Sequence, residues 1–259
     1  MQLTIVGASG SVSGPESPAS CYLVQAPFEG RTFSLLLDLG PGSFGALYRY
    51  LDPAELDAVA LSHLHPDHCV DMCGLYVAGR YAATAPWRRI AVYGPLGTPA
   101  RLARAYEVNG ADEPGLSIAE WFDHRVWQAE QMIGPFMVHT RRVAHPVEAY
   151  AIRLSENSDA GGSLVFTGDT GPTPVLSELA HGVDLLLSEA AFLTGAENPP
   201  DLHLTGADAA AIADEAGVGL LVLTHIPPWH DPEQVLAEAR RVTHRPVELA
   251  VAGARWTIG

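Results

Sequence analysis

The fold is decided by Leu61-Ser62-His63-Leu64-His65-Pro66-Asp67-His68, a segment that begins at the last residue of the apolar run 58–61. That run predicts a β-strand. Side chains two positions apart in an extended chain point the same way, so His63 and His65 can bind one metal ion together. Pro66 fits the first position of a helix, where its missing N–H costs nothing. Asp67 and His68 then begin that helix and project towards a second ion. Three histidines and one aspartate within six positions are too dense for an ordinary surface turn.

Further ligand types follow other predicted strands. His145 comes just after the strand predicted at 136–140, Asp169 lies in a glycine-flanked turn after 163–166, and His225 follows 220–223. Each of them alone would be an ordinary turn residue, but the ligands at 63–68 require partners. Imidazole and carboxylate without thiolate suit zinc, with manganese and iron as alternatives. We therefore expect a centre that holds two divalent metal ions.

The wider pattern alternates strands and helices. Apolar runs bounded by Gly, Pro, Asp and Asn predict strands at 3–6, 22–25, 33–37, 58–61, 90–93, 136–140, 150–154, 163–166, 183–187, 220–223 and 247–251. Helical patterns lie at 43–51, 67–81, 98–106, 173–180, 205–216 and 232–241. This order predicts β-sheets sandwiched between helix layers, with functional loops at strand ends. No linker, repeat or charge block divides the chain, so we expect a single domain over residues 1–259.

Composition limits the class of partner. Acidic residues outnumber basic ones 30 to 15, which gives a formal charge of −15, and every basic residue is Arg. A protein that binds a nucleic-acid backbone needs clustered cations, yet the nearest to clusters here are isolated pairs at 88–89, 141–142 and 240–241. Long nucleic acids are therefore disfavoured, whereas a small ligand held by metal is compatible with this charge.

Targeting and redox signals are lacking in the sequence. The first ten residues have no basic region and too short an apolar run for a signal peptide, and no stretch approaches a membrane span. The three cysteines, Cys21, Cys69 and Cys73, form no disulfide framework and are interpreted as small buried thiols. We expect a cytoplasmic protein without a membrane partner; the sequence does not decide between a monomer and a homodimer.

These motifs together resemble the metallo-β-lactamase superfamily, and within it the branch of the tRNA 3′-processing endonucleases (ribonuclease Z) and related phosphodiesterases. The signature 63–68 is followed in the family's order by the His145, Asp169 and His225 segments, and the resemblance covers almost the whole chain. It implies a four-layer αββα sandwich. It also implies His63, His65 and His145 on one metal, and Asp67, His68 and His225 on the other. Asp169 would bridge the two metals.

The resemblance also implies a mechanism. Two divalent ions lower the pKa of a shared water and offset charge on a phosphoryl group. Asp67 can orient the nucleophile, and His203, in the loop before the helix predicted at 205–216, is our candidate general acid for the leaving group. Glu189 follows a predicted strand and can orient His203.

The substrate is inferred from what the chain lacks. Ribonuclease Z enzymes carry a long arm, usually between the equivalents of His145 and Asp169. Here only 24 positions separate these residues (169 − 145), and 155–162 reads as a polar turn. The segments 10–15, 143–146, 200–204 and 224–229 resemble the compact actinobacterial cyclic-nucleotide phosphodiesterases of this fold. We therefore expect a small phosphodiester substrate, a 3′,5′-cyclic nucleotide. A ribonuclease Z-like endoribonuclease is the main alternative. A thioester or lactone hydrolase is a further one, disfavoured because Cys69 follows His68 where those enzymes usually carry a nearby Gly.

Overall fold

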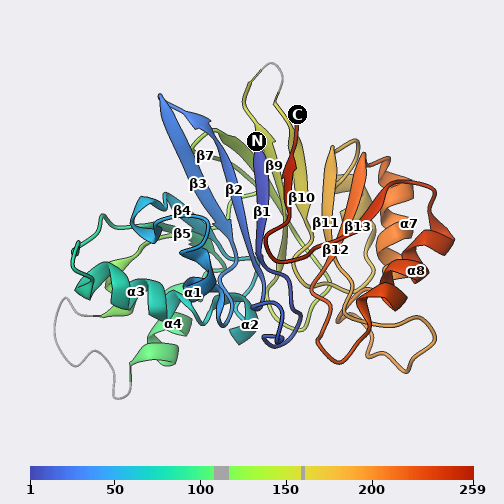
Figure 1. Cartoon of the computed structure of the whole chain (residues 1–259), viewed down its shortest axis with the longest axis horizontal. Coiled ribbons are helices and arrows are strands. Elements are labelled where there is room, and N and C mark those ends of the chain that lie inside the picture. Colours follow the sequence, from blue (N-terminus) through green and yellow to red (C-terminus); the bar gives the residue numbers. More distant parts are fainter. Residues whose placement is uncertain (108–116, 159–160) are drawn as a thin grey trace.

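The computed structural model describes residues 1–107, 117–158 and 161–259 and contains two seven-stranded sheets packed face to face (Figure 1). The first sheet has the order β14 (Arg255–Thr257), β1 (Gln2–Gly7), β2 (Cys21–Phe28), β3 (Arg31–Leu37), β4 (Ala58–Ala60), β5 (Ala91–Gly94) and β6 (Asp123–Val126). The second has the order β13 (Val247–Leu249), β12 (Leu220–Thr224), β11 (Leu185–Glu189), β10 (Ser163–Phe166), β9 (Tyr150–Glu156), β8 (Phe136–Arg142) and β7 (Glu130–Ile133).

Helices cover the outer face of each sheet (Figure 1). The first sheet is covered by α1 (Ser43–Leu47), α3 (Met72–Tyr81), α4 (Thr98–Tyr106) and α5 (Ile118–Trp121). The second is covered by α6 (Pro174–Leu179), α7 (Gly206–Ala216) and α8 (Pro232–Val242). The short helix α2 (Pro66–Cys69) and the 3₁₀ turn η1 (Pro53–Glu55) lie in connections. The expected αββα arrangement of layers is confirmed.

The period-2 alternation of apolar side chains explains how both faces of each sheet are buried. In β10, Leu164 and Phe166 point into the cluster between the two sheets, whereas Val165 points into the cluster under α6, α7 and α8. In β3, Leu35 and Leu37 face the other sheet and Leu36 faces the helices. Both faces of these strands are apolar because both are covered, which is why they read as continuous apolar runs.

The functional edge follows from the direction of the strands. The strands β3 to β6 run parallel to one another, and so do β10 to β13. Their carboxyl ends therefore meet along one edge of the sandwich, where the loops at the bottom of Figure 1 gather. In the described residues, no helix is long and apolar enough to cross a membrane.

Most predicted elements are present, with informative exceptions. The predicted helix 67–81 is broken into α2 and α3, and the strands β6, β7 and β14 were not expected. All three are edge strands of their sheets, and their sequences are largely polar. The polar turn expected at 155–162 includes residues 159–160, which lie outside the described residues.

Candidate metal centre

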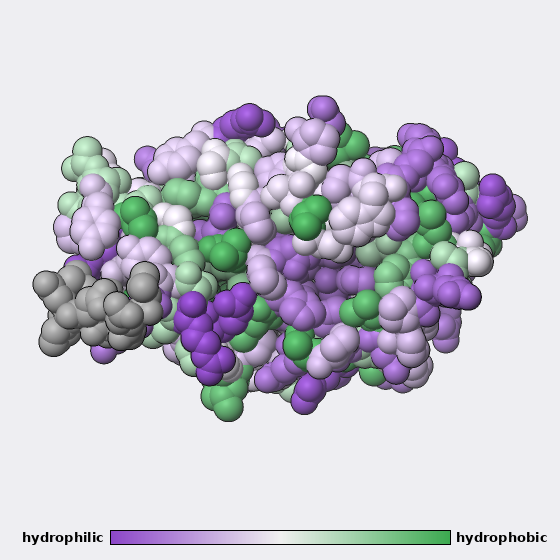
Figure 2. All heavy atoms as spheres, turned by 90° about the horizontal axis from the view of Figure 1, so that it is seen from below, coloured by the Kyte–Doolittle hydropathy of each residue, from purple (hydrophilic) through white to green (hydrophobic). Residues whose placement is uncertain are grey.

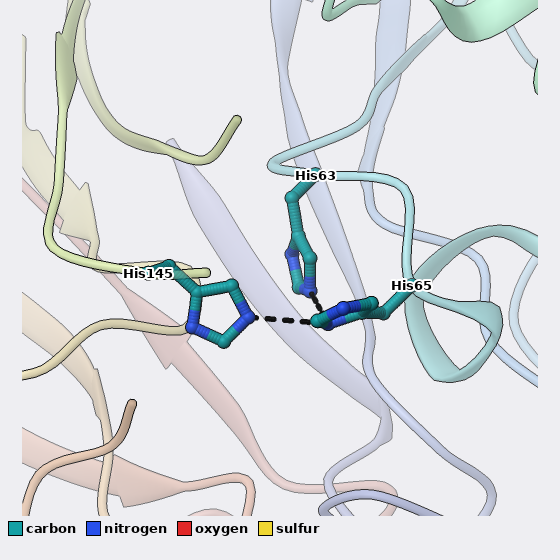
Figure 3. Close-up of side chains that lie close together, drawn as sticks. All are labelled: His63, His65 and His145. Carbon is teal, nitrogen blue, oxygen red and sulfur yellow. Dashed lines mark hydrogen bonds between the residues drawn. The ribbon is translucent and has the colours of Figure 1, made fainter. Parts of the chain in front are cut away.

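Three histidine side chains from two separate loops converge on one point (Figure 3). His63 and His65 lie between β4 and α2, and His145 lies between β8 and β9. Nδ1 of His65 is 3.0 Å from Nε2 of His63 and 3.1 Å from Nε2 of His145. A neutral imidazole has a single N–H, so hydrogen bonds alone leave lone pairs facing one another here. The arrangement instead suits three ligands around one metal ion.

The outer ring nitrogens determine which nitrogens are free to bind a metal. Nδ1 of His145 donates to the carbonyl oxygen of Leu202 at 3.0 Å, so its Nε2 presents a lone pair. Nδ1 of His63 lies 3.1 Å from Oγ of Ser62. Burial lowers the pKa of His145 to about 4, and it also lowers the pKa of His63 and of His65. All three imidazoles are therefore neutral near pH 7, as a metal ligand must be.

A second group of ligand types lies beside the first. It contains Asp67, His68, Asp169 and His225, with one ligand atom of each lying within 4.8 Å of the others. Nε2 of His68 is 3.4 Å from Oδ2 of Asp67, and Nε2 of His225 is 3.2 Å from Oδ2 of Asp169. Both groups lie at the same edge, and Figure 2, which views that edge, shows hydrophilic side chains around a central hollow.

Two buried atoms of this second group show what it requires. Nε2 of His68 and Oδ1 of Asp169 are 3.2 Å apart, both are buried, and neither has a hydrogen-bond partner. Nδ1 of His68 is already paired with Asp38 at 2.7 Å, which leaves Nε2 with a lone pair. An unpartnered buried polar atom is costly, and a cation between these two atoms removes that cost. The cluster is able to bind metal.

The electrostatics of the second group agree with this. Burial acts to lower the pKa of His68, but the carboxylates of Asp169 and Asp38 outweigh it and raise that pKa. Burial acts to raise the pKa of Asp169, but His225 and His68 outweigh it and lower that pKa. The carboxylates thus attract positive charge to this point, as a proton or as a metal ion.

Asp38, which sequence reasoning missed, supports both groups. Its carboxylate accepts from the backbone N–H of Ser62, from Oγ of Ser62 and from Nδ1 of His68, each at 2.7 Å. Ser62 in turn orients His63, so one carboxylate fixes a histidine of each group. Asp38 directly follows β3, and its only sequence signal is a polar residue after an apolar run. Such outer carboxylates hold ligand histidines in a single tautomer.

The outer ring nitrogen of His225, Nδ1, contacts a hydroxyl group instead of a carboxylate. Its Nδ1 lies 2.9 Å from Oγ of Ser20, and the phenol of Tyr22 lies 3.4 Å from that hydroxyl. The backbone of His225 has a φ of 57°, an uncommon value for a residue with a side chain. A Cβ atom on Gly10 would lie 2.1 Å from the His225 carbonyl oxygen, so only glycine fits there. Sterically restricted backbone of this kind is typical of functional loops.

His203 lies beside the metal cluster and contacts Glu189. Its Nδ1 is 2.9 Å from Oε1 of Glu189 and 3.9 Å from Oδ2 of Asp169. The carboxylate of Glu189 is buried and also accepts from the backbone N–H groups of Thr170 and Ala191. The expected contact between Glu189 and His203 is therefore present. Because Nδ1 is occupied, Nε2 of His203 is the atom left to meet a substrate.

The remaining histidines and cysteines lie apart from these groups. None of His124, His139, His181, His230 or His244 belongs to a ligand cluster in the described part of the chain. The three cysteines are free thiols. Cys69 donates to the carbonyl oxygen of His65 at 3.2 Å, and burial raises its pKa to about 12. Cys69 is a packing residue beside the loop that carries His63 and His65.

The chain is similar to known proteins in sequence and in fold. The profile of the beta-lactamase superfamily domain matches residues 34–226. An uncharacterized protein of Mycobacterium leprae is 44% identical over 100% of this chain and 89% of its own length. YhfI of Bacillus subtilis, a probable metallo-hydrolase, is 29% identical over 99% of both chains. Its crystal structure matches this one with a TM-score of 0.83 over 98% of both chains. Human tRNase Z, short form, matches over 100% of both chains with a TM-score of 0.74 and 21% identity.

Proposed function

The chain belongs to the beta-lactamase superfamily, and from that premise we propose that this metal-dependent hydrolase is a phosphodiesterase that opens 3′,5′-cyclic nucleotides. The observation that supports it best is two adjacent ligand groups, three histidines in one and two aspartates with two histidines in the other, beside a third that Asp169 forms with Glu189 and His203. Two divalent cations, zinc by ligand type, would supply an activated water and offset negative charge at phosphorus.

Each residue of the two ligand groups, and His203 beside them, then has a role. His63, His65 and His145 would hold one cation, and Asp67, His68 and His225 would hold the other. Asp169 lies 3.2 Å from His225 and 3.8 Å from His63, so it is placed to serve both. Asp67, the most accessible carboxylate of the set, orients the nucleophile. The side chain of His203 is 11% exposed, and its Nε2 would give its proton to the leaving 3′ oxygen of a bound phosphodiester.

The choice of a small cyclic substrate rests on charge and size. The chain carries a formal charge of −15 and has no basic cluster in its sequence, so the metals must supply most of the attraction for phosphate. A cyclic nucleotide presents a single phosphodiester and needs few further cationic contacts. The second candidate is an endoribonuclease, which the likeness of fold to human tRNase Z favours.

The decisive experiment compares substrates on protein of measured metal content. Metal-loaded protein is assayed against cAMP, cGMP, a nitrophenyl phosphodiester and pre-tRNA, with elemental analysis of the same sample. We expect turnover of a cyclic nucleotide and about two metal ions per chain. Turnover of the nitrophenyl compound alone would refute the cyclic-nucleotide assignment, and protein that gains no activity with zinc or manganese would refute metal dependence.

A substitution tests the general acid. His203→Ala should lower kcat on cAMP by about 10²–10⁴-fold, the usual contribution of general acid catalysis, without loss of metal. A nitrophenolate leaving group needs little protonation, so the nitrophenyl diester should be affected much less. Equal losses on both substrates would assign His203 to phosphate positioning instead. The exposed His244, which lies outside the ligand groups, provides the control substitution His244→Ala.

A further inference from the structure

A single exposed segment connects β11 to α7 and carries His203. Its two ends are joined, because the backbone N–H of Phe192 donates to the carbonyl of Leu204 at 3.0 Å. The ring of Phe192 meets the ring of His203 edge-on, with centroids 5.0 Å apart. Residues 194–201 between these ends are exposed to solvent. The segment therefore depends on a few specific contacts for its position.

One of these contacts comes from a buried carboxylate on α8. Glu238 is 5% exposed, and its Oε2 accepts from both the backbone N–H and the Oγ of Thr194, at 3.1 and 2.8 Å. Within the described residues, no cation forms an ion pair with Glu238. The buried residues around it on the same helix, Val235, Leu236 and Ala239, are apolar. A buried carboxylate without a cation is costly, and packing of α8 alone would be served better by an apolar side chain.

The same segment contacts both parts of the site. The carbonyl of Leu202 accepts from Nδ1 of His145, and the next residue, His203, pairs with Glu189. A shift of the segment would therefore move the proposed general acid most directly, because His203 is part of the segment, whereas His145 is carried by the separate connection between β8 and β9. Gly171 permits the close approach, since a Cβ there would lie 2.6 Å from Cα of Asp201.

We propose that Glu238 is a positioning residue, which holds the segment 192–204 through Thr194 and thereby places His203 for proton transfer. This inference rests on the proposed role of His203. Reacting groups must be held to within a fraction of an ångström, and a misplacement of about 1 Å can cost about 10²-fold in rate. Glu238 acts from a helix that does not itself contribute a ligand.

Kinetics with two leaving groups separate positioning from general stability. Glu238→Ala should lower kcat on cAMP by about 10–100-fold with KM little changed, while the nitrophenyl diester is affected much less. Glu238→Gln retains an acceptor for Thr194 and should restore most of the rate. Thr194→Val keeps the backbone N–H bond to Glu238 but loses the hydroxyl, so it should lower the rate in the same direction as Glu238→Ala by a smaller factor, and Thr194→Ser should behave like the wild type. Glu233→Ala, an exposed carboxylate on the same helix, is the matched control.

Hydrogen exchange supplies a readout that does not depend on turnover. Amides of 192–204 should exchange faster in Thr194→Val and Glu238→Ala, with unchanged metal content and unchanged exchange in β11. Equal loss of rate on both substrates, or unchanged exchange in the segment, would overturn the proposal. If the wild type opens no cyclic nucleotide, the proposed substrate fails, yet the exchange comparison still decides whether Glu238 holds the segment. Should Glu238→Ala fail to fold, Thr194→Val decides both measurements.

Discussion

Asp169 is the residue through which the two ligand groups are joined. Its Oδ1 faces His68 and its Oδ2 faces His225, each at 3.2 Å, and Oδ2 lies 3.8 Å from His63 of the other group. The turn that carries it is made by Gly168, whose φ of 59° is open to glycine without strain. A Cβ at that glycine would also lie 2.8 Å from the Tyr150 carbonyl oxygen.

Asp169→Ala should therefore remove metal from both groups at once. Elemental analysis of the purified variant is expected to show loss of most bound metal, since each group loses a carboxylate and its opposed imidazole remains uncompensated. Glu120→Ala, an exposed carboxylate on α5, serves as the control. A variant that keeps one full equivalent of metal would show that Asp169 serves one ion alone.

Asp38→Asn tests the support behind the ligands. The substituted amide offers one acceptor where three donors arrive, so His68 and Ser62 compete and the histidine tautomers are no longer fixed. Metal affinity should fall by about 10–100-fold, as for other partners behind metal ligands. Competition with a chromophoric chelator measures it, and an unchanged affinity would mean that Asp38 serves folding only.

The sequence identified ligand types more readily than their supports. His63, His65, Asp67 and His68 form a dense local pattern whose chemistry is legible without a structure. The partners of these residues are distant in sequence: Ser20 pairs with His225 across 205 positions, and Leu202 with His145 across 57. The sequence around a serine hydroxyl or a backbone carbonyl does not indicate that it will orient a distant histidine. Only the fold therefore identifies these partners.

At the scale of elements, burial decided which strands could be predicted. Strands covered on both faces, such as β10 and β12, are continuous apolar runs and were expected. The edge strands β6, β7 and β14 pair on one side only and keep polar side chains, so their sequences resemble loops. The helix at 205–216 was predicted well because its caps are explicit: Thr205 and Asp208 form a capping box, and Gly217 ends it with a φ of 72°.

Asp57, the last residue before β4, is the centre of an ion-pair cluster with Arg31 and Arg88 that should contribute to acid stability. Burial acts to raise the pKa of Asp57, but hydrogen bonds from Arg31, from the Ser34 N–H and from Arg88 outweigh it and lower that pKa. Because the folded pKa lies below the unfolded one, the stabilisation is complete above the unfolded pKa of about 3.9. It is lost as the pH falls through the folded pKa.

Asp57→Asn should accordingly lower the free energy of unfolding by about 1.5–3 kcal/mol at neutral pH, the range for hydrogen bonds to a charged group. The difference from the wild type should shrink below about pH 4, where the native carboxylate is also protonated. Urea unfolding at several pH values measures it, with the exposed Asp123→Asn as the control. A difference that persists unchanged into acid would show that packing, and not charge, is responsible.

At the scale of the whole molecule, the layered fold brings the loops that carry the ligand groups to one edge, but it does not choose the substrate. Two apolar layers and parallel strands suffice to gather the ligands, and this much follows from hydrophobic patterning. Substrate choice depends on what surrounds the metals, and the fold is shared with human tRNase Z. Two features distinguish a small substrate from a tRNA here: the formal charge of −15 and the short connection between His145 and Asp169.

Pre-tRNA should therefore be a poor substrate. The strands β9 and β10 lie between His145 and Asp169, and just 24 positions separate these two residues (169 − 145), which leaves too little sequence there for a long RNA-binding arm. The formal charge of −15 repels a polyanion, and the arginine pairs in the sequence are too scattered to release many counterions. At physiological salt, gel analysis should show very slow or no cleavage of pre-tRNA by protein that turns over cAMP.

Any residual cleavage of pre-tRNA should depend weakly on salt. Each phosphate contact contributes about −0.7 to −0.9 to the slope of log affinity against log salt concentration, and few contacts are available. Efficient cleavage beside the discriminator base with a steep salt slope would show that this compact chain binds RNA by another surface.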